Sequence, residues 1–421
     1  MGTNLRRRDF LKSLTVLAGA AASAPALAFG QSAGQTGYDN TAAHRALAGR
    51  ARIKEVVNVS LRVEKDLGSY PDWVGNPRAM QIGGGTYLEV RTDQGVTGIG
   101  PGVDPALIAG ISRVLVGQDP CDINVLAERL YGLAAPGGGY RGSAGAEIAV
   151  WDLIGKMANQ PLYKLWGGGR DRVMPYASML RLSTPQERGQ LAAKLKGDGW
   201  KAIKLRNSFP TMKEDIQVVE EVRKACGDDF GIMCDGNKAT LNLASTQGVA
   251  WDFPRAVQTA LEFQRLGVYW LEEPLQRYDY EGLARLKSLI SMHMAGGEGN
   301  RRINEFKDLL DRNCFDVVQP EVMLEGPAHL RKIAVLAEAQ GKMCEPHAGD
   351  SRLGTICDLH LVASWPNAPY LEIFNDQPIG DYTNPFAMFE NPILLDKDGY
   401  FNLPQGPGLG MRIRQDLIQK T

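Results

Sequence analysis

The chain has 421 residues, 48 of them glycine, and its 44% hydrophobic and 23% charged residues are typical of a globular enzyme. The glycines follow no Gly-X-Y period and form no repeat block, which excludes collagen and low-complexity sequence. The net charge is −1 without a long basic or acidic run, so we expect no nucleic-acid partner.

The first 28 residues have the features of a bacterial export signal. Arg7-Arg8-Asp9-Phe10-Leu11-Lys12 matches the twin-arginine motif, an apolar run follows at 14–22, and Ala26-Leu27-Ala28 is a small-x-small cleavage site. The alternative is a basic amphipathic N-terminus that stays attached. We predict a twin-arginine signal peptide at 1–28, a linker at 29–50, periplasmic localisation, and no membrane association after cleavage.

The next segment predicts a small α+β domain over residues 51–170. Residues 52–100 alternate apolar and polar side chains as strands do, and Thr92-Asp93-Gln94-Gly95 is a hairpin turn signal. Residues 103–166 have helical periodicity, which is clearest at 144–157.

From residue 171 to 385, short apolar strands alternate with amphipathic helices, and each strand ends in a polar residue. The predicted strand ends are Ser178, Arg206, Asp235, Glu272, Glu298, Glu321, His347 and Glu372. Eight parallel strands joined by crossover helices close into a barrel whose active site lies at the carboxyl ends of the strands. We therefore predict an α/β barrel with these polar side chains gathered in one bowl.

Asp235, Glu272 and Glu298 are predicted to end three consecutive strands. Three carboxylates without cysteine or histidine between them suit a hard cation bound by oxygen, so we predict a site for one Mg²⁺ rather than zinc. The alternative is that each acid caps the following helix or pairs with a lysine.

Lys204 and Arg206 are two residues apart on the second predicted strand, so their side chains share the barrel interior. This pair favours binding of a small-molecule carboxylate, although both cations could instead pair with the acids of the barrel. Glu321 and His347 end neighbouring strands, where a carboxylate beside an imidazole makes a general acid/base pair. The alternative for His347 is a hydrogen-bonded core histidine.

With these residues in place, the chain resembles the enolase superfamily, mandelate racemase subgroup, from about residue 52 to the end. The resemblance is carried by Lys204-Leu205-Arg206, Asp235-Gly236-Asn237, Leu271-Glu272-Glu273-Pro274, Gly297-Glu298, Gln319-Pro320-Glu321 and His347. It implies a modified (β/α)7β TIM barrel under an N-terminal α+β capping domain. Pro407-Gly408-Leu409-Gly410 resembles the family's return strand, which implies that residues 386–421 return to the cap.

The resemblance also implies roles for individual residues. Asp235, Glu272 and Glu298 would bind Mg²⁺, and Lys204 and Glu372 would contact the substrate carboxylate. His347, with Glu321 as its partner, would abstract the proton α to that carboxylate.

Two positions depart from the family pattern. Arg206 stands where the family often has a lysine base, and arginine is a poor base because it stays protonated. Glu321 stands where the dyad acid is usually aspartate. A single base argues against racemisation and favours β-elimination of water.

We therefore predict an acid-sugar dehydratase, a hydro-lyase that acts on an aldonate or aldarate and yields a 2-keto-3-deoxy acid. The alternatives are a racemase, epimerase or cycloisomerase on a related sugar acid, or a non-catalytic sugar-acid binder. The resemblance also implies a homo-oligomer, a dimer or octamer. The candidate substrate-binding residues are Asn237 and, on cap segments expected to close over the substrate, Tyr70, Trp73, Tyr140 and Arg141.

Overall fold

The computed structural model describes residues 51–133, 142–240, 249–350 and 352–419. The predicted signal peptide and linker, and the candidate residues Tyr140 and Arg141, lie outside these ranges. Within the described ranges, no helix is long and apolar enough to cross a membrane.

The N-terminal part of the described chain contains two small antiparallel sheets and a group of helices. One sheet has the strand order β1-β4-β5 and the other is the hairpin β2-β3. The strands and helices are β1 (Ile53–Ser60), β2 (Val63–Pro71), β3 (Pro77–Gly83), β4 (Thr86–Thr92), β5 (Thr97–Pro101), η2 (Pro105–Leu107), α2 (Ile108–Leu115), η3 (Pro120–Asp122), α3 (Ile123–Tyr131), α4 (Ala144–Ala158) and α5 (Leu162–Leu165).

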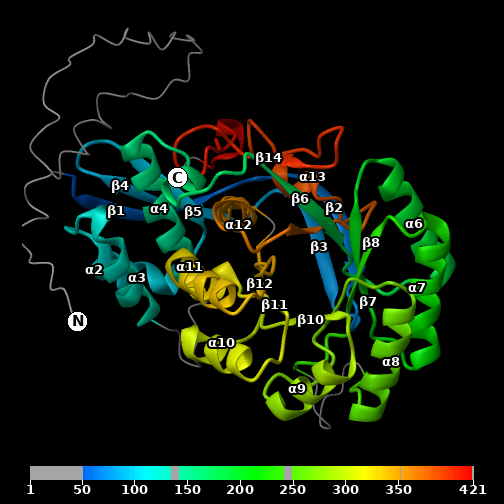
Figure 1. Ribbon diagram of the computed structural model, residues 1–421. Helices are drawn as coiled ribbons and strands as arrows, with labels where there is room; N and C mark the ends of the chain where they lie inside the picture. The colour runs from blue at the N-terminus through cyan, green and yellow to red at the C-terminus, as the bar shows by residue number, and fades with distance from the viewer. Residues whose placement is uncertain (1–50, 134–141, 241–248, 351, 420–421) are drawn as a thin grey trace, which may run out of the picture. The chain divides into compact units, whose positions relative to one another are not determined.

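Eight parallel strands come next, joined by seven crossover helices that lie outside the curled sheet (Figure 1). The hydrogen-bonded order is β12-β11-β10-β9-β8-β7-β6-β13. The first of the eight strands along the chain, β6, therefore pairs with the last, β13. The strands are β6 (Arg172–Ser178), β7 (Ala202–Arg206), β8 (Gly231–Asp235), β9 (Trp270–Glu272), β10 (His293–Gly296), β11 (Val317–Val318), β12 (Met343–Cys344) and β13 (Tyr370–Phe374). The predicted (β/α)7β architecture is confirmed.

The crossover helices are α6 (Pro185–Gly197), α7 (Met212–Cys226), α8 (Phe253–Arg265), α9 (Tyr280–Leu289), α10 (Arg302–Asp311), α11 (Val322–Ala339) and α12 (Leu353–Ser364). Side chains cap the N-termini of several of these helices. Thr184 and Glu187 form a reciprocal capping box at α6, and Thr211 and Glu214 form one at α7.

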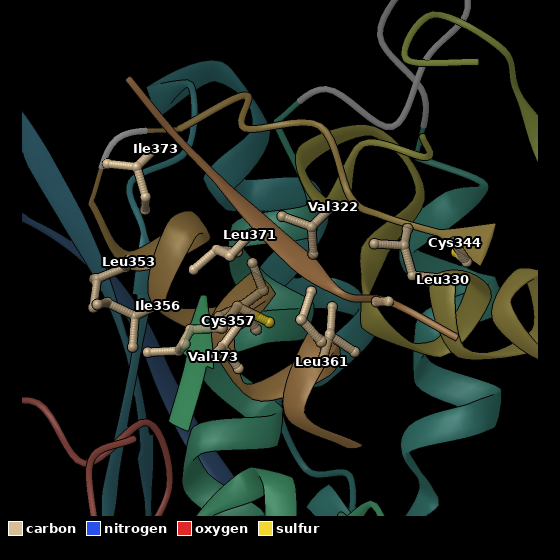
Figure 2. Close-up of a cluster of buried hydrophobic side chains, with 14 of the residues drawn as sticks. Val173, Val322, Leu330, Cys344, Leu353, Ile356, Cys357, Leu361, Leu371 and Ile373 are labelled. Atoms are coloured by element: carbon tan, nitrogen blue, oxygen red, sulfur yellow. The ribbon is translucent and has the colours of Figure 1, made fainter. Parts of the chain in front are cut away.

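The barrel core is packed by apolar side chains from the helices and strands together. Figure 2 shows α12 contributing Leu353, Ile356, Cys357 and Leu361 against Leu371 of β13. All five side chains are at most 1% exposed. This packing fixes β13, and therefore Glu372, relative to the rest of the barrel.

Four of the predicted strand ends are correct, namely Ser178, Arg206, Asp235 and Glu272. Glu298 lies two residues after β10, and Glu321 and His347 lie three residues after β11 and β12. Each of the latter two comes after a proline, which has no N–H to extend a ladder. Glu372 lies in the middle of β13, which continues to Phe374.

After β13 the chain forms α13 (Thr383–Phe386), β14 (Phe401–Asn402), which is antiparallel to β6, and the short helix η4 (Gln415–Leu417). It then lies against N-terminal elements. The Leu409 N–H donates to Asp152 of α4 over 2.7 Å, and Ile418 forms a bridge with Leu61. The end of the chain is thereby joined to the segment that precedes the barrel.

Candidate active site

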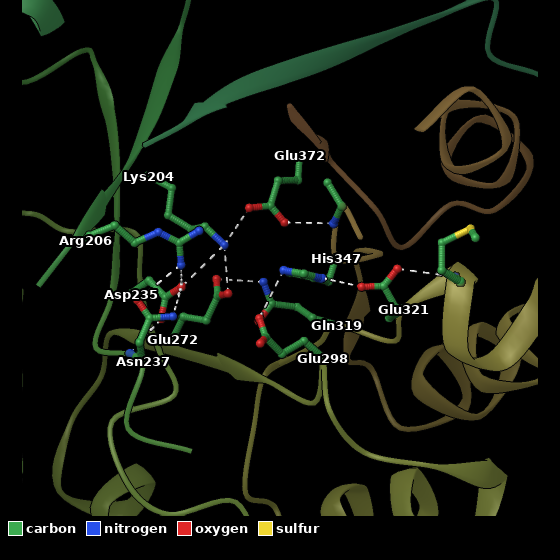
Figure 3. Close-up of polar contacts among 12 residues, drawn as sticks. Lys204, Arg206, Asp235, Asn237, Glu272, Glu298, Gln319, Glu321, His347 and Glu372 are labelled. Atoms are coloured by element: carbon green, nitrogen blue, oxygen red, sulfur yellow. Dashed lines mark hydrogen bonds and ion pairs between the residues drawn. The ribbon is translucent and has the colours of Figure 1, made fainter. Parts of the chain in front are cut away.

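Parallel register brings the central charged residues into one row. Arg206 of β7 is the partner of Asp235 of β8, and Asp235 is the partner of Glu272 of β9. Figure 3 shows these side chains together with Lys204, Glu298, His347 and Glu372 around one space. The structure therefore gathers all the residues predicted as metal ligands and all those predicted as catalytic, with Glu321 behind His347.

Lys204 lies at the centre of the charged group and is fully buried. Its Nζ lies 2.8 Å from Glu272, 2.7 Å from Glu372 and 3.8 Å from Asp235. Burial alone would lower the pKa of Lys204, but the charges of Glu272, Glu372 and Asp235 outweigh it and raise that pKa. Lys204 is therefore a permanent cation.

Arg206 is held by several acceptors. Its Nη1 contacts the Asp235 carboxylate and donates to Asn237 Oδ1 over 3.2 Å, and its Nε donates to the Met179 carbonyl over 2.7 Å. Burial opposes its charge, but Asp235 and other carboxylates outweigh this and raise the pKa of Arg206. The pairing of Lys204 and Arg206 with barrel acids, an alternative left open by the sequence, is the arrangement observed.

His347 has a carboxylate at each ring nitrogen. Nδ1 lies 2.8 Å from Glu321 Oε2, and Nε2 lies 3.1 Å from Glu298 Oε2. Burial would lower the pKa of His347, but Glu298, the hydrogen bond to Glu321 and the charge of Glu372 raise it well above its ordinary value. The main-chain N–H of His347 donates to the Pro320 carbonyl over 3.1 Å, so a backbone hydrogen bond also holds His347 beside Glu321.

Glu272 is a carboxylate of this group whose negative charge is opposed by its surroundings. Burial, together with Asp235, Glu372 and Glu298, raises the pKa of Glu272 to about 7, even though Lys204 opposes this. Its Oε2 accepts from Gln319 Nε2 over 2.8 Å and from Trp270 Nε1 over 3.2 Å. Neither Gln319 nor Trp270 was among the candidate residues, yet Gln319 comes directly after the apolar pair of β11, the signal that identified the other polar residues.

The three predicted metal ligands already have partners within the protein. Within the described ranges, no group of three or more His, Cys, Asp or Glu side chains is arranged so that it could hold a metal ion. The reason is that Asp235, Glu272 and Glu298 point to Arg206, Lys204 and His347.

In type and charge, however, the residues fit a divalent cation. Asp235, Glu272 and Glu298 offer only oxygen donors, which Mg²⁺ prefers. Counted as charged, the group has three cations and five carboxylates, an excess of two negative charges. The cations are Lys204, Arg206 and His347, and the carboxylates are Asp235, Glu272, Glu298, Glu321 and Glu372. A divalent cation would balance this excess.

The hairpin β2-β3 carries the described candidate residues of the cap. The Trp73 ring lies 4.7 Å from the Arg206 guanidinium, so this hairpin reaches the barrel mouth. Tyr70 is buried, and its hydroxyl has no hydrogen-bond partner among the described residues. Beside Glu321, a cavity of about 580 Å³ opens between the N-terminal strands and the barrel, lined by residues that include Arg78, Gly349 and Arg352.

Comparison with protein families gives two matches. Residues 80–167 match the N-terminal domain of the mandelate racemase / muconate lactonizing enzymes. Residues 187–417 match the enolase C-terminal domain-like family.

Two curated relatives align with most of the chain. An arabinonate dehydratase of Saccharolobus solfataricus is 28% identical over 350 residues, covering 79% of this chain and 89% of that protein. An L-talarate/galactarate dehydratase of Salmonella typhimurium is 31% identical over 320 residues, covering 74% of each chain.

Solved structures with the same fold include a D-glucarate dehydratase from Agrobacterium tumefaciens complexed with magnesium. It is 26% identical, has a TM-score of 0.75, and covers 88% of this chain and 99% of its own. The 3,6-anhydro-D-galactonate cycloisomerase from Zobellia galactanivorans is 25% identical, with a TM-score of 0.70 and coverage of 88% and 100%.

Proposed function

Because the chain belongs to the mandelate racemase / muconate lactonizing enzyme family of the enolase superfamily, we propose that this lyase removes water from a sugar acid. The substrate would be an aldonate or aldarate, and the product a 2-keto-3-deoxy acid. Two dehydratase relatives, at 28% and 31% identity, support this class of reaction.

The observation that carries the proposal is that the described charged group contains one side chain suited to act as a base. His347 stands on one side, with Glu321 orienting its ring. On the β7 side, Lys204 and Arg206 are both protonated cations fixed by carboxylates. A racemase needs a base on each face of the α-carbon, whereas β-elimination can proceed with one.

In the proposed reaction, His347 Nε2 takes the α-proton as the Cα–H bond breaks. For this, Nε2 must first release its own proton to solvent and give up its contact with Glu298. The electron pair forms the C2–C3 double bond, the C3–O bond breaks, and His347 returns the proton to the departing hydroxide as water. The enol then takes a proton from solvent at C3 and becomes the ketone.

The other residues would bind and orient the substrate. Lys204 and Glu372 lie together at 2.7 Å, so the Lys204 ammonium would meet the substrate carboxylate while Glu372 fixes the position of that ammonium. Asp235, Glu272 and Glu298 would hold Mg²⁺, which when bound would offset the negative charge that grows on the substrate carboxylate.

A cycloisomerase or epimerase is the second candidate, because a cycloisomerase has the same fold at a TM-score of 0.70. It would share the abstraction of the α-proton by His347. It would differ in the fate of the resulting intermediate, since no water would leave the molecule.

The test is a panel of aldonates and aldarates incubated with the enzyme and Mg²⁺ in D₂O. We expect a 2-keto-3-deoxy acid from at least one substrate, detected by its semicarbazone and by NMR. EDTA should abolish turnover, and added Mg²⁺ should restore it. If the α-proton exchanges but this product forms from no substrate of the panel, the second candidate is favoured. If neither exchange nor product is detected, the protein is a non-catalytic sugar-acid binder.

A further inference from the structure

The acid of the histidine dyad is a glutamate, and its side chain has to fit beside the backbone that comes after His347. Glu321 Oε2 lies 2.8 Å from His347 Nδ1, while Oε1 accepts from the Met323 N–H over 3.3 Å. Figure 3 shows the Glu321 carboxylate between the His347 ring and the start of α11. The carboxylate is thus clamped in one orientation.

Gly349 lies directly against this carboxylate. A Cβ atom added at Gly349 would overlap the carboxylate carbon and both oxygens of Glu321. Gly349 is not among the glycines with a positive φ, so its backbone conformation is one that alanine also adopts. Gly349 is exposed, and these Glu321 atoms are the three nearest to that position. The obstacle to a side chain here is therefore the Glu321 carboxylate.

We propose that Gly349 is a positioning residue for the acid/base dyad, matched to the length of Glu321; the inference rests on the proposed role of His347. A side chain at position 349 displaces the Glu321 carboxylate, which has room to swing into the adjacent cavity of about 580 Å³. The His347 ring then loses the partner at Nδ1. A shorter acid at position 321 leaves room for the same side chain.

The test is a double-mutant cycle of Gly349→Ala, Glu321→Asp and the double variant, each assayed with Mg²⁺. We expect Gly349→Ala to lower kcat by about 100-fold with little change in KM, because the base is misplaced. When Glu321→Asp is also present, we expect Gly349→Ala to lower kcat by less than about threefold. Equal losses in both backgrounds would overturn the proposal.

A second measurement separates this proposal from the proposed reaction. In ¹⁵N-histidine-labelled protein, the Nδ1 proton of His347 should give a downfield NMR signal that is lost in Gly349→Ala. Persistence of that signal in Gly349→Ala overturns the proposal, whatever the enzyme does to sugar acids. Gly169→Ala is the matched control, since Gly169 is also an exposed loop glycine without positive φ, and no atom of the described part of the chain lies within 4 Å of an added Cβ.

Discussion

At the scale of single residues, His347 is defined by what surrounds its two nitrogens. Glu321 at Nδ1 fixes the ring, and Glu298 at Nε2 occupies the position from which a proton would be taken. A ring with a carboxylate on each side favours the protonated form. Proton abstraction therefore requires Glu298 to have another partner, which is the role we propose for the metal site.

Replacement of His347 by asparagine tests this role. Asparagine retains a hydrogen-bond donor toward Glu321 but cannot take up a proton, so we expect exchange of the substrate α-proton in D₂O to fall by about 10³-fold. Binding of the substrate, measured by calorimetry, should change little. His329→Asn is the matched control, because His329 is also paired with a glutamate, Glu128, but lies on α11 outside the charged group. Exchange at the wild-type rate in His347→Asn would remove His347 from the reaction.

The sequence could predict which residues gather in the site but not how they pair. Strand periodicity places Lys204, Asp235 and Glu272 on one interior surface, because side chains two apart share a face and parallel strands end together. Which acid each cation meets depends on side-chain rotamers and on burial. Gly349 escaped prediction for the same reason, since its importance comes from a contact with Glu321 that no motif indicates.

At the scale of elements, prediction worked best where strands are regular. The ends of β6 to β9 were correct because an apolar run stops there at a polar residue. Beyond β10 the strands shrink to two residues before Pro320 and Pro346, and the site residues Glu321 and His347 lie in the loops after them. A proline ends strand pairing at a position that the hydrophobic pattern alone does not predict.

Helix α12 holds a buried histidine that links three parts of the chain. The Tyr163 N–H donates to His360 Nδ1 over 3.2 Å, and His360 Nε2 donates to the Leu409 carbonyl over 3.2 Å. Burial lowers the pKa of His360 to about 4, from an ordinary value of 6.5. The folded state therefore keeps this ring neutral, while the unfolded state protonates it below about pH 6.5.

This difference in pKa makes the stability of the fold depend on pH. The contribution of His360 to stability is complete above pH 6.5 and is lost as the pH falls toward 4. Between about pH 7 and pH 5 the wild type should lose about 2 kcal/mol of unfolding free energy that His360→Gln does not lose. Urea unfolding of both proteins at the two pH values measures this. Parallel losses in the two proteins would show that His360 is not kept neutral by the fold.

At the scale of the whole molecule, one carboxylate joins the N-terminal domain to the end of the chain. Asp152 of α4 accepts from the N–H groups of Ile99 in β5 and Leu409, each over 2.7 Å, and pairs with Lys156. The interaction connects residues 257 apart in sequence. Burial of a charge is tolerated here because backbone donors and a lysine satisfy it.

Gly408 makes this junction possible, and its replacement by alanine tests it. Gly408 has φ +71°, a conformation costly for alanine, and an added Cβ would overlap the Asp152 carboxylate. We expect Gly408→Ala to lower the free energy of unfolding by about 3 kcal/mol, from backbone strain and loss of the Asp152 contacts. Gly406→Ala is the control in the same segment, because its φ is not positive and its nearest added contact is 3.3 Å. If both variants unfold at the same urea concentration as the wild type, the end of the chain does not stabilise the enzyme through Asp152. If only Gly408→Ala is destabilised and its kcat with Mg²⁺ is retained, the junction serves stability rather than the reaction.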